Sequence, residues 1–270
     1  MKDKIIEEIL ATFGKMTDPS LMQADTANNL KNLVTMATSS VAFTGLQVIA
    51  GSLIAFYFLI HLVQTTMKDR SDPDAIFKDL ALCCLYAAIV TNLGMLVINL
   101  ADVCSNLVTV VQGGISGLWD GLGQAGNNFD TATFKQTMKD KNLIVLILDA
   151  CLYMVVGNLA AIIIQVIAKV AVYTIDIELV IRTILLPVGI AQLPDDGWRG
   201  PGGRYIKAFC GCFLQLAVVA AALQSYQILC LNAMSPDNPD TVFVSILAAG
   251  FAVAGLCMKA SAIAREVAGA

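Results

Sequence analysis

The feature that most constrains this chain is a set of five long apolar stretches with few or no charges. They lie at residues 41–64, 80–100, 143–168, 208–231 and 241–258. A helix that crosses a bilayer needs about 20 apolar residues at about 1.5 Å per residue. The sequence therefore predicts a protein that crosses the membrane several times.

Composition favours the same interpretation, because 57% of the residues are hydrophobic and only 14% are charged. A water-soluble domain of this composition would expose more apolar surface than its interior could hide. In lipid every backbone donor and acceptor must be paired internally, and the stretches are too long and too poorly alternating for barrel strands. The predicted fold is all-α: a polytopic, integral membrane helical bundle with residues 41–270 as its transmembrane domain.

The first 40 residues predict amphipathic helices rather than a span. Apolar residues recur at helical spacing up to Gly14, and a second start signal follows at Asp18-Pro19, with an N-cap residue before a proline. We expect this region, residues 1–40, to lie outside the cytoplasm at the membrane interface or to pack on a neighbouring subunit. It lacks the continuous apolar core of a cleavable signal peptide.

Two later regions need a specific interpretation. Residues 102–141 contain Gly113, Gly114, Gly117, Gly121, Gly123 and Gly126 and predict a glycine-rich surface loop. From residue 143 the apolar character continues to about residue 193, which is roughly twice what one crossing requires. We therefore expect a division near Lys169, a re-entrant or sixth span at 170–193, and a helix break at Pro187 and Gly189.

The distribution of Lys and Arg favours five crossings. With five, the basic residues of 68–78, 169–207 and 259–265 all fall on one side, which the positive-inside rule makes cytoplasmic. The N-terminus is then extracytoplasmic and the C-terminus cytoplasmic. A sixth crossing would move Arg199, Arg204 and Lys207 outside, so it is the less favoured alternative.

Motifs of enzymes and cofactor sites are missing. Residues 121–126 spell a dinucleotide fingerprint, but they stand between membrane spans rather than between a strand and a helix. The eight cysteines lie in or beside the spans and are expected to serve as small apolar packing, and Cys210 and Cys212 point to different sides of a helix, which is poor zinc geometry. We expect no cofactor and no metal. A net charge of −4 leaves no footprint for strong nucleic-acid binding.

Ionisable residues inside the spans are the candidate functional residues. Asp149 lies about two turns into the third long stretch. We expect it either to hold neighbouring helices or subunits together or to line a polar path. Asp176, Glu178 and Arg182 follow on the same run, and Glu178 can pair with Arg182 at four-residue spacing. His61, the single histidine, is expected to be structural, with a proton relay as the alternative.

Small residues in the last span predict close helix packing. Ala248, Ala252 and Gly255 share one face, and Gly250 and Ala254 share another. We expect these faces to contact other helices of the bundle or another subunit.

Three ordered patterns resemble the TrbL-like polytopic membrane subunits of type IV secretion systems, and more closely those of conjugative elements in Gram-positive Firmicutes. The first pattern is Ile54-Ala55-Phe56-Tyr57-Phe58-Leu59-Ile60 together with the residues that follow it as far as Asp102. The second is Leu186-Pro187-Val188-Gly189 followed by Leu193-Pro194, Arg199-Gly200 and Tyr205-Ile206-Lys207. The third is Lys259-Ala260-Ser261, after the last apolar stretch. The resemblance begins at about residue 40.

This resemblance implies a non-enzymatic channel or scaffold subunit with about five crossings, an extracytoplasmic N-terminus and a cytoplasmic C-terminus. Its implied partners are further copies in a ring, secretion ATPases, other conjugation membrane subunits, membrane lipid, and a transient single-stranded DNA or relaxase substrate. For residues 186–207 it implies a structural element at the membrane edge. The rival hypothesis from the residues is a small-molecule or ion transporter, motivated by Asp149, Glu178 and the predicted break at Pro187.

Overall fold

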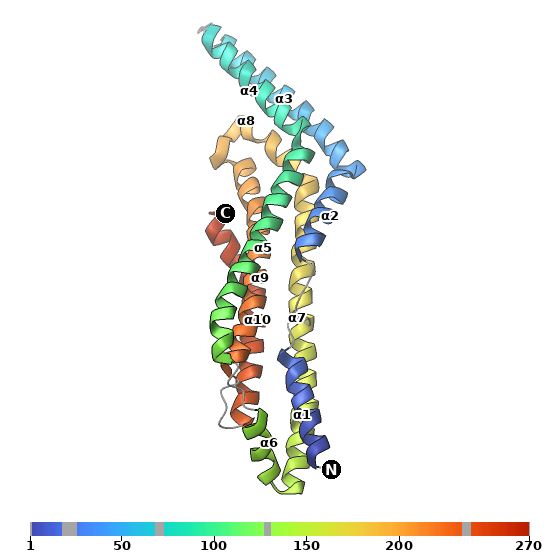
Figure 1. The fold of residues 1–270 in the computed structure, drawn as a ribbon. Coiled ribbons are helices and arrows are strands. Elements are labelled where there is room, and N and C mark those ends of the chain that lie inside the picture. Colours follow the sequence, from blue (N-terminus) through green and yellow to red (C-terminus); the bar gives the residue numbers. More distant parts are fainter. Residues whose placement is uncertain (1, 18–25, 68–72, 127–130, 234–238, 270) are drawn as a thin grey trace. The chain divides into compact units, whose positions relative to one another are not determined.

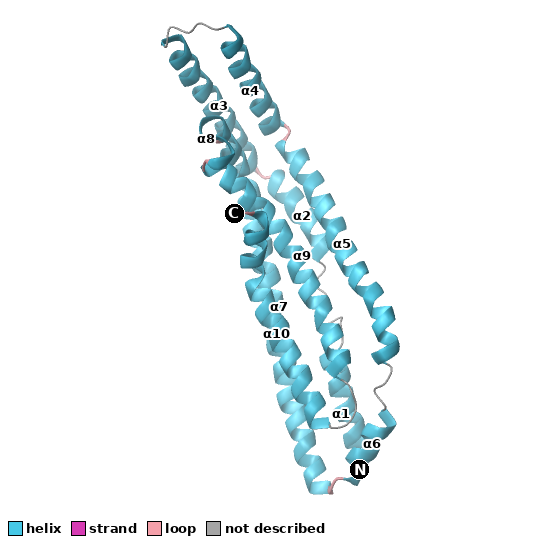
Figure 2. Ribbon diagram, turned by 90° about the vertical axis from the view of Figure 1, so that its left-hand side faces the viewer, coloured by secondary structure: helices cyan, strands magenta, loops and turns pink. Residues whose placement is uncertain are grey.

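The computed structural model describes residues 2–17, 26–67, 73–126, 131–233 and 239–269, and all regular structure in these ranges is helical (Figures 1 and 2). The predicted all-α fold is thus confirmed. The helices are α1 (Lys2–Thr17), α2 (Thr26–Thr38), α3 (Val41–Met67), α4 (Pro73–Thr91), α5 (Leu93–Gly126), α6 (Thr131–Asp140), α7 (Leu143–Ala191), α8 (Leu193–Asp196), the 3₁₀ helix η2 (Gly197–Arg199), α9 (Pro201–Ala233) and α10 (Pro239–Ala268).

Within these ranges, five helical segments are long and apolar enough to cross a membrane. They are Val41–Met67, Leu93–Val111, Leu143–Ala191, Pro201–Tyr226 and Asp240–Ala268. Four of them overlap predicted spans, although Leu143–Ala191 extends well beyond the predicted span 143–168. The architecture is that of a multi-pass membrane protein, as the apolar stretches indicate.

The second predicted span, residues 80–100, is placed differently. α4 ends at Thr91 and α5 begins at Leu93, so the chain turns at Asn92 in the middle of the expected crossing. The apolar segment of spanning length is instead Leu93–Val111. Hydropathy alone misses this turn, because the residues on both sides of Asn92 are equally apolar.

The predicted glycine-rich loop at 102–141 is also wrong. α5 continues to Gly126, and α6 occupies Thr131–Asp140. Each glycine costs a helix about 1 kcal/mol relative to alanine. The helix nevertheless continues beyond the spanning segment, which ends at Val111, as far as Gly126.

α7 is one helix of 49 residues, with no division near Lys169. The segment 170–193 is therefore neither re-entrant nor a separate sixth span, since residues 170–191 extend the helix that begins at Leu143. The helix also continues through Pro187 and Gly189 and ends at Ala191, so the predicted break lies too early. Proline removes only one intrahelical hydrogen bond, and the apolar surroundings keep the remaining bonds.

The chain forms two compact units. Unit 1 comprises residues 1–26, 108–173 and 217–260, and unit 2 comprises residues 27–107, 174–216 and 261–270. In unit 1, α1 buries the apolar side chains of Ile6, Ile9 and Phe13. α1 therefore packs on its own chain and does not present this face to a membrane surface. The predicted second helix start at Asp18-Pro19 lies outside the described residues.

In unit 2, α3 and α4 lie side by side as a hairpin (Figure 2). Side-chain hydrogen bonds stabilise the junction of this hairpin with α2 and α5. The backbone N–H of Phe43 donates to Oγ of Ser40 at 3.2 Å, Nδ2 of Asn92 donates to the carbonyl of Ala88 at 2.9 Å, and Nε2 of Gln47 donates to the carbonyl of Val90 at 2.9 Å. Ser40 is thus the N-cap of α3, and Gln47 satisfies the carbonyl of Val90 at the end of α4. The side chain of Asn92 adds a second bond to the carbonyl of Ala88, which already accepts from the backbone N–H of Asn92.

Candidate functional site

The first polar group lies in unit 1 and is called here the Lys141 cluster: Lys141, Asp149, Tyr153 and Asp240. Nζ of Lys141 lies 2.7 Å from Oδ2 of Asp149 and 4.0 Å from Oδ1 of Asp240. The hydroxyl of Tyr153 donates to Oδ1 of Asp240. Two carboxylates from α7 and α10 thus share one cation, which offsets the cost of placing them beside apolar surface.

The corner between α6 and α7 positions this cation. Lys141 follows the last residue of α6, and its long side chain reaches along the first turns of α7 to Asp149. Nζ of Lys2 donates at 2.9 Å to each of the carbonyls of Lys139 and Lys141. α1 therefore helps to hold the corner between α6 and α7 in place. Asp149 forms its ion pair within its own chain, as expected of a residue that holds helices together.

An aromatic group lies beside the Lys141 cluster. The ring centroids of Tyr153 and Phe243 are 4.9 Å apart, and Phe13 of α1 lies 5.7 Å from Tyr153 and 6.0 Å from Phe243. Tyr153 is only 1% exposed, so its ring packs in the interior while its hydroxyl meets Asp240. Three helices distant in sequence meet at this tyrosine.

The second polar group lies in unit 2 and is called the Glu178 cluster: Glu178, Arg182 and Arg265. Nε and Nη2 of Arg182 donate to Oε1 of Glu178 at 2.9 and 2.7 Å. Nη2 of Arg265, from the end of α10, lies 3.4 Å from the same oxygen. The predicted pairing of Glu178 with Arg182 is confirmed, and Arg265 is a partner that sequence spacing could not indicate.

Asp176 is separate from the Glu178 cluster, although only two residues away. It is buried, and within the described ranges its Oδ1 has no hydrogen-bond partner, as is also true of Oγ1 of Thr183 two turns later in α7. Of the four ionisable residues predicted together, the structure pairs only Glu178 with Arg182. Asp149 belongs to the other unit.

The α7–α9 turn, residues 186–207, is held by close contacts between its glycines and its backbone. A Cβ on Gly189 would meet the ring of Tyr205 at 2.7 Å, and one on Gly203 would overlap the carbonyl oxygen of Trp198. The hydroxyl of Tyr205 donates at 2.9 Å to the carbonyl of Arg182. The absence of a side chain at Gly189 thus leaves space for Tyr205, which connects α9 to α7. Gly189 allows this close contact and does not break the helix as predicted.

The small residues of α10 lie on two different faces of the helix, as the sequence predicts. Gly250 and Ala254 are buried, and a Cβ on Gly250 would overlap Cδ1 of Ile164 on α7. Ala248 and Ala252 are exposed, and a Cβ on Gly255 would meet nothing within 4 Å. One face therefore packs inside unit 1, and the other is uncovered in this chain.

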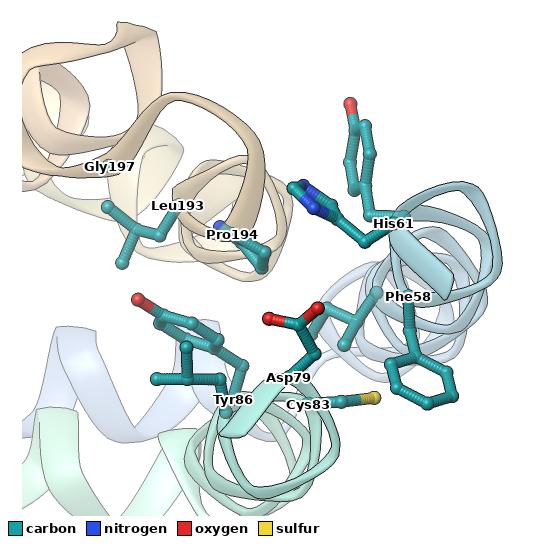
Figure 3. Close-up of a pocket in the computed structure, with 11 residues that line it drawn as sticks. Phe58, His61, Asp79, Cys83, Tyr86, Leu193, Pro194 and Gly197 are labelled. Atoms are coloured by element: carbon teal, nitrogen blue, oxygen red, sulfur yellow. The ribbon is translucent and has the colours of Figure 1, made fainter. Parts of the chain in front are cut away.

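A cavity of about 220 Å³, called the hairpin pocket, lies within unit 2 between α3, α4 and α8 (Figure 3). His61 and Asp79 face it from α3 and α4, and Tyr86 extends toward Leu193 of α8. Sequence reasoning considered His61 alone and missed Asp79. A signal existed, because residues equally far from the loop of a helical hairpin lie side by side. His61 is seven residues before position 68, and Asp79 is seven after position 72.

The side chains that commonly bind metals are dispersed over the part of the chain that the structure describes. No group of three His, Cys, Asp or Glu side chains there could hold a metal ion. The eight cysteines are free thiols; Cys210 is exposed and Cys212 buried, as expected for two residues on different sides of one helix.

Loss of the charge on Glu178 is expected to destabilise unit 2 moderately. In Glu178→Gln, two arginines lose their shared carboxylate in a site where Glu178 and Arg182 are 24% and 20% exposed. We expect a loss of about 1–2 kcal/mol, because the pair is partly screened by solvent. Thermal unfolding in detergent measures this loss. The matched control, Glu266→Gln, changes an exposed residue beside Arg265 and should be neutral. Equal stability of both variants would contradict a stabilising cluster.

Comparison with known proteins adds no assignment: the chain matches no family model, no curated protein and no solved structure.

Proposed function

We propose that this protein is a non-enzymatic channel or scaffold subunit of a conjugative type IV secretion apparatus, which works as a homo-oligomer in the cytoplasmic membrane. The resemblance to TrbL-like subunits motivates the proposal. One of its patterns, residues 186–207, coincides with the α7–α9 turn, where the pattern residue Gly189 is required by the ring of Tyr205. A pattern maintained by packing supports a structural role for that element.

The observation that carries the proposal is how little of each apolar segment the chain itself covers. The buried share of the most apolar window ranges from 11% in Val41–Met67 to 50% in Pro201–Tyr226. A protein that encloses a substrate path alone buries its central helices, whereas a subunit of a larger assembly leaves faces for lipid and for other copies. The uncovered Ala248, Ala252 and Gly255 face of α10 allows such close approach.

The rival function, a small-molecule or ion transporter, is less well supported. Its motivating residues do not converge on one site: Asp149 pairs with Lys141 in unit 1, and Glu178 pairs with Arg182 in unit 2. The helix break expected near Pro187 is not present, since α7 continues to Ala191. A carboxylate with its own cation has less capacity to bind a transported ion.

The proposed partners follow the same reasoning. Separate secretion ATPases supply the power, other conjugation membrane subunits complete the apparatus, and single-stranded DNA or a relaxase passes transiently. A net charge of −4 suits transient rather than tight contact with DNA. In the proposed orientation the N-terminus is extracytoplasmic and the C-terminus cytoplasmic, so that the basic segments face the cytoplasm.

Deletion of the gene is expected to abolish transfer of the conjugative element that carries it. Transfer frequency to a marked recipient is the measurement, and the same gene supplied on a plasmid is expected to restore it. Growth and DNA content of the donor should not change, because the protein serves transfer only. Unchanged transfer in the deletion strain would refute the proposal, and a growth defect relieved by one particular nutrient or ion would favour the transporter.

A further inference from the structure

The hairpin pocket brings together four polar side chains that have no hydrogen-bond or ion-pair partner among the residues that the structure describes. Tyr57 and His61 of α3 and Asp79 and Tyr86 of α4 line it. Among the described residues, no side-chain hydrogen bond or ion pair reaches these four groups. All four side chains are half-buried, and beside lipid such groups find few other hydrogen-bond partners. A cavity that gathers four unsatisfied ones is therefore suited to a ligand that satisfies them.

The chemistry of the lining selects a ligand that donates hydrogen bonds and carries positive charge. The carboxylate of Asp79 only accepts hydrogen bonds, and neutral imidazole and tyrosine hydroxyls can accept them as well. The rings of Tyr57 and Tyr86 add faces that attract a cation. Among the described residues, no Lys or Arg lines the cavity. A primary ammonium satisfies these groups better than a trimethylammonium does, because it has N–H donors for Asp79 and His61.

The position of the pocket indicates how the ligand arrives. Leu82, which lines the cavity, is 40% exposed, and Leu59 on the facing helix is also exposed. The surface around the cavity is thus apolar, as expected of a surface in contact with lipid. On the other side Leu193, Pro194 and Gly197 close the pocket (Figure 3). Proline has no backbone N–H, so this wall contributes mainly apolar contacts.

We propose that the hairpin pocket binds the primary ammonium headgroup of an ethanolamine phospholipid, with Asp79 as the main partner of the ammonium. An engineered cavity of about 150 Å³ holds benzene, so a cavity of about 220 Å³ accommodates an ethanolamine group. The acyl chains would remain against the exposed leucines of the hairpin. This inference does not depend on the proposed role in secretion, because it concerns a lipid site that any function of the chain would retain.

Trp198 provides a direct probe of binding, because it is exposed and follows the pocket residue Gly197. The full chain has two tryptophans, so Trp119→Phe leaves Trp198 as the single emitter. The purified protein in detergent is titrated with phosphatidylethanolamine that has brominated acyl chains, and quenching of Trp198 is recorded. Phosphatidylcholine with the same chains is the parallel titration. We expect half-maximal quenching at about tenfold less phosphatidylethanolamine than phosphatidylcholine.

The variants test the assignment to Asp79. Asp79→Asn is expected to weaken binding of the ethanolamine lipid about tenfold, to the level of the choline lipid, because an amide lacks the charge of the carboxylate. Asp74→Asn, an exposed acid on the same helix, is the matched control and should bind like the parent. Tyr86→Phe removes only one hydroxyl, so it should weaken binding less than Asp79→Asn. It also tests the pocket if Asp79→Asn fails to elute as a folded species.

Three results would overturn the proposal. The first is equal quenching by both lipids, and the second is an undiminished preference for ethanolamine in both pocket variants. The third is competition by free phosphoethanolamine at the same concentration as the lipid, which would assign the pocket to a soluble amine.

Discussion

Replacing Gly203 with alanine is expected to destabilise unit 2 by about 3 kcal/mol, which is the upper range for overpacking a tight site. The new Cβ would overlap the backbone carbonyl carbon and oxygen of Trp198. Backbone cannot rotate away as the end of a side chain can, so η2 and the start of α9 must separate. The measurement is the rate of alkylation of Cys212, a buried thiol on α9 in the same unit, in detergent at increasing temperature.

The control for Gly203 is Gly51→Ala in α3. A Cβ there would meet nothing within 4 Å, so alanine is expected to be neutral or to stabilise the helix by up to about 1 kcal/mol. If Gly203→Ala protects Cys212 as well as the parent does, the close packing of the α7–α9 turn is contradicted. Gly202→Ala, which would overlap the carbonyl of Gly189, provides a second, independent test of the same turn.

Tyr153→Ala is expected to have an effect at least as large in unit 1, about 4 kcal/mol. The substitution removes a ring that is 1% exposed and that contacts Phe13 of α1 and Phe243 of α10. It also removes the hydroxyl that donates to Asp240. Alkylation of Cys257, a buried thiol of unit 1, reports the loss, and Cys212 of unit 2 should respond less.

Tyr153→Phe separates the ring from the hydroxyl. It keeps the aromatic contacts and removes one hydrogen bond, so we expect a cost of about 1 kcal/mol. If the two variants are equally destabilised, the hydrogen bond to Asp240 rather than the aromatic packing stabilises this region. If neither differs from the parent, the contact of α1 with α7 and α10 contributes nothing to stability.

The helical class and the apolar segments were predictable because a single physical constraint determines both. Backbone groups in an apolar medium must bond within their own segment, so length and hydropathy are enough to indicate helices. Helix boundaries depend on finer interactions. At the end of α4 the carbonyl of Val90 accepts a hydrogen bond from Gln47 of α3, 43 positions away, so the turn inside the predicted span 80–100 involves a tertiary contact that hydropathy cannot indicate.

The candidate residues show the same division between local and distant information. Glu178 and Arg182 are four residues apart on one helix, so their pairing follows from helical geometry alone. Arg265 reaches Glu178 across 87 positions, and Tyr153 reaches Asp240 across the same separation. One sequence without tertiary information contains no signal for such pairs. The role of Gly189 was missed similarly, because the ring that requires it belongs to Tyr205 on the next long helix.

The junction of the α3–α4 hairpin has a consequence for how the protein is made. The three side-chain hydrogen bonds that close it join Ser40 with Phe43, Asn92 with Ala88, and Gln47 with Val90. All six residues precede Leu93, so these bonds need no residue that is synthesised after Asn92. The hairpin can therefore form its polar contacts while helices α5 to α10 are still to be synthesised.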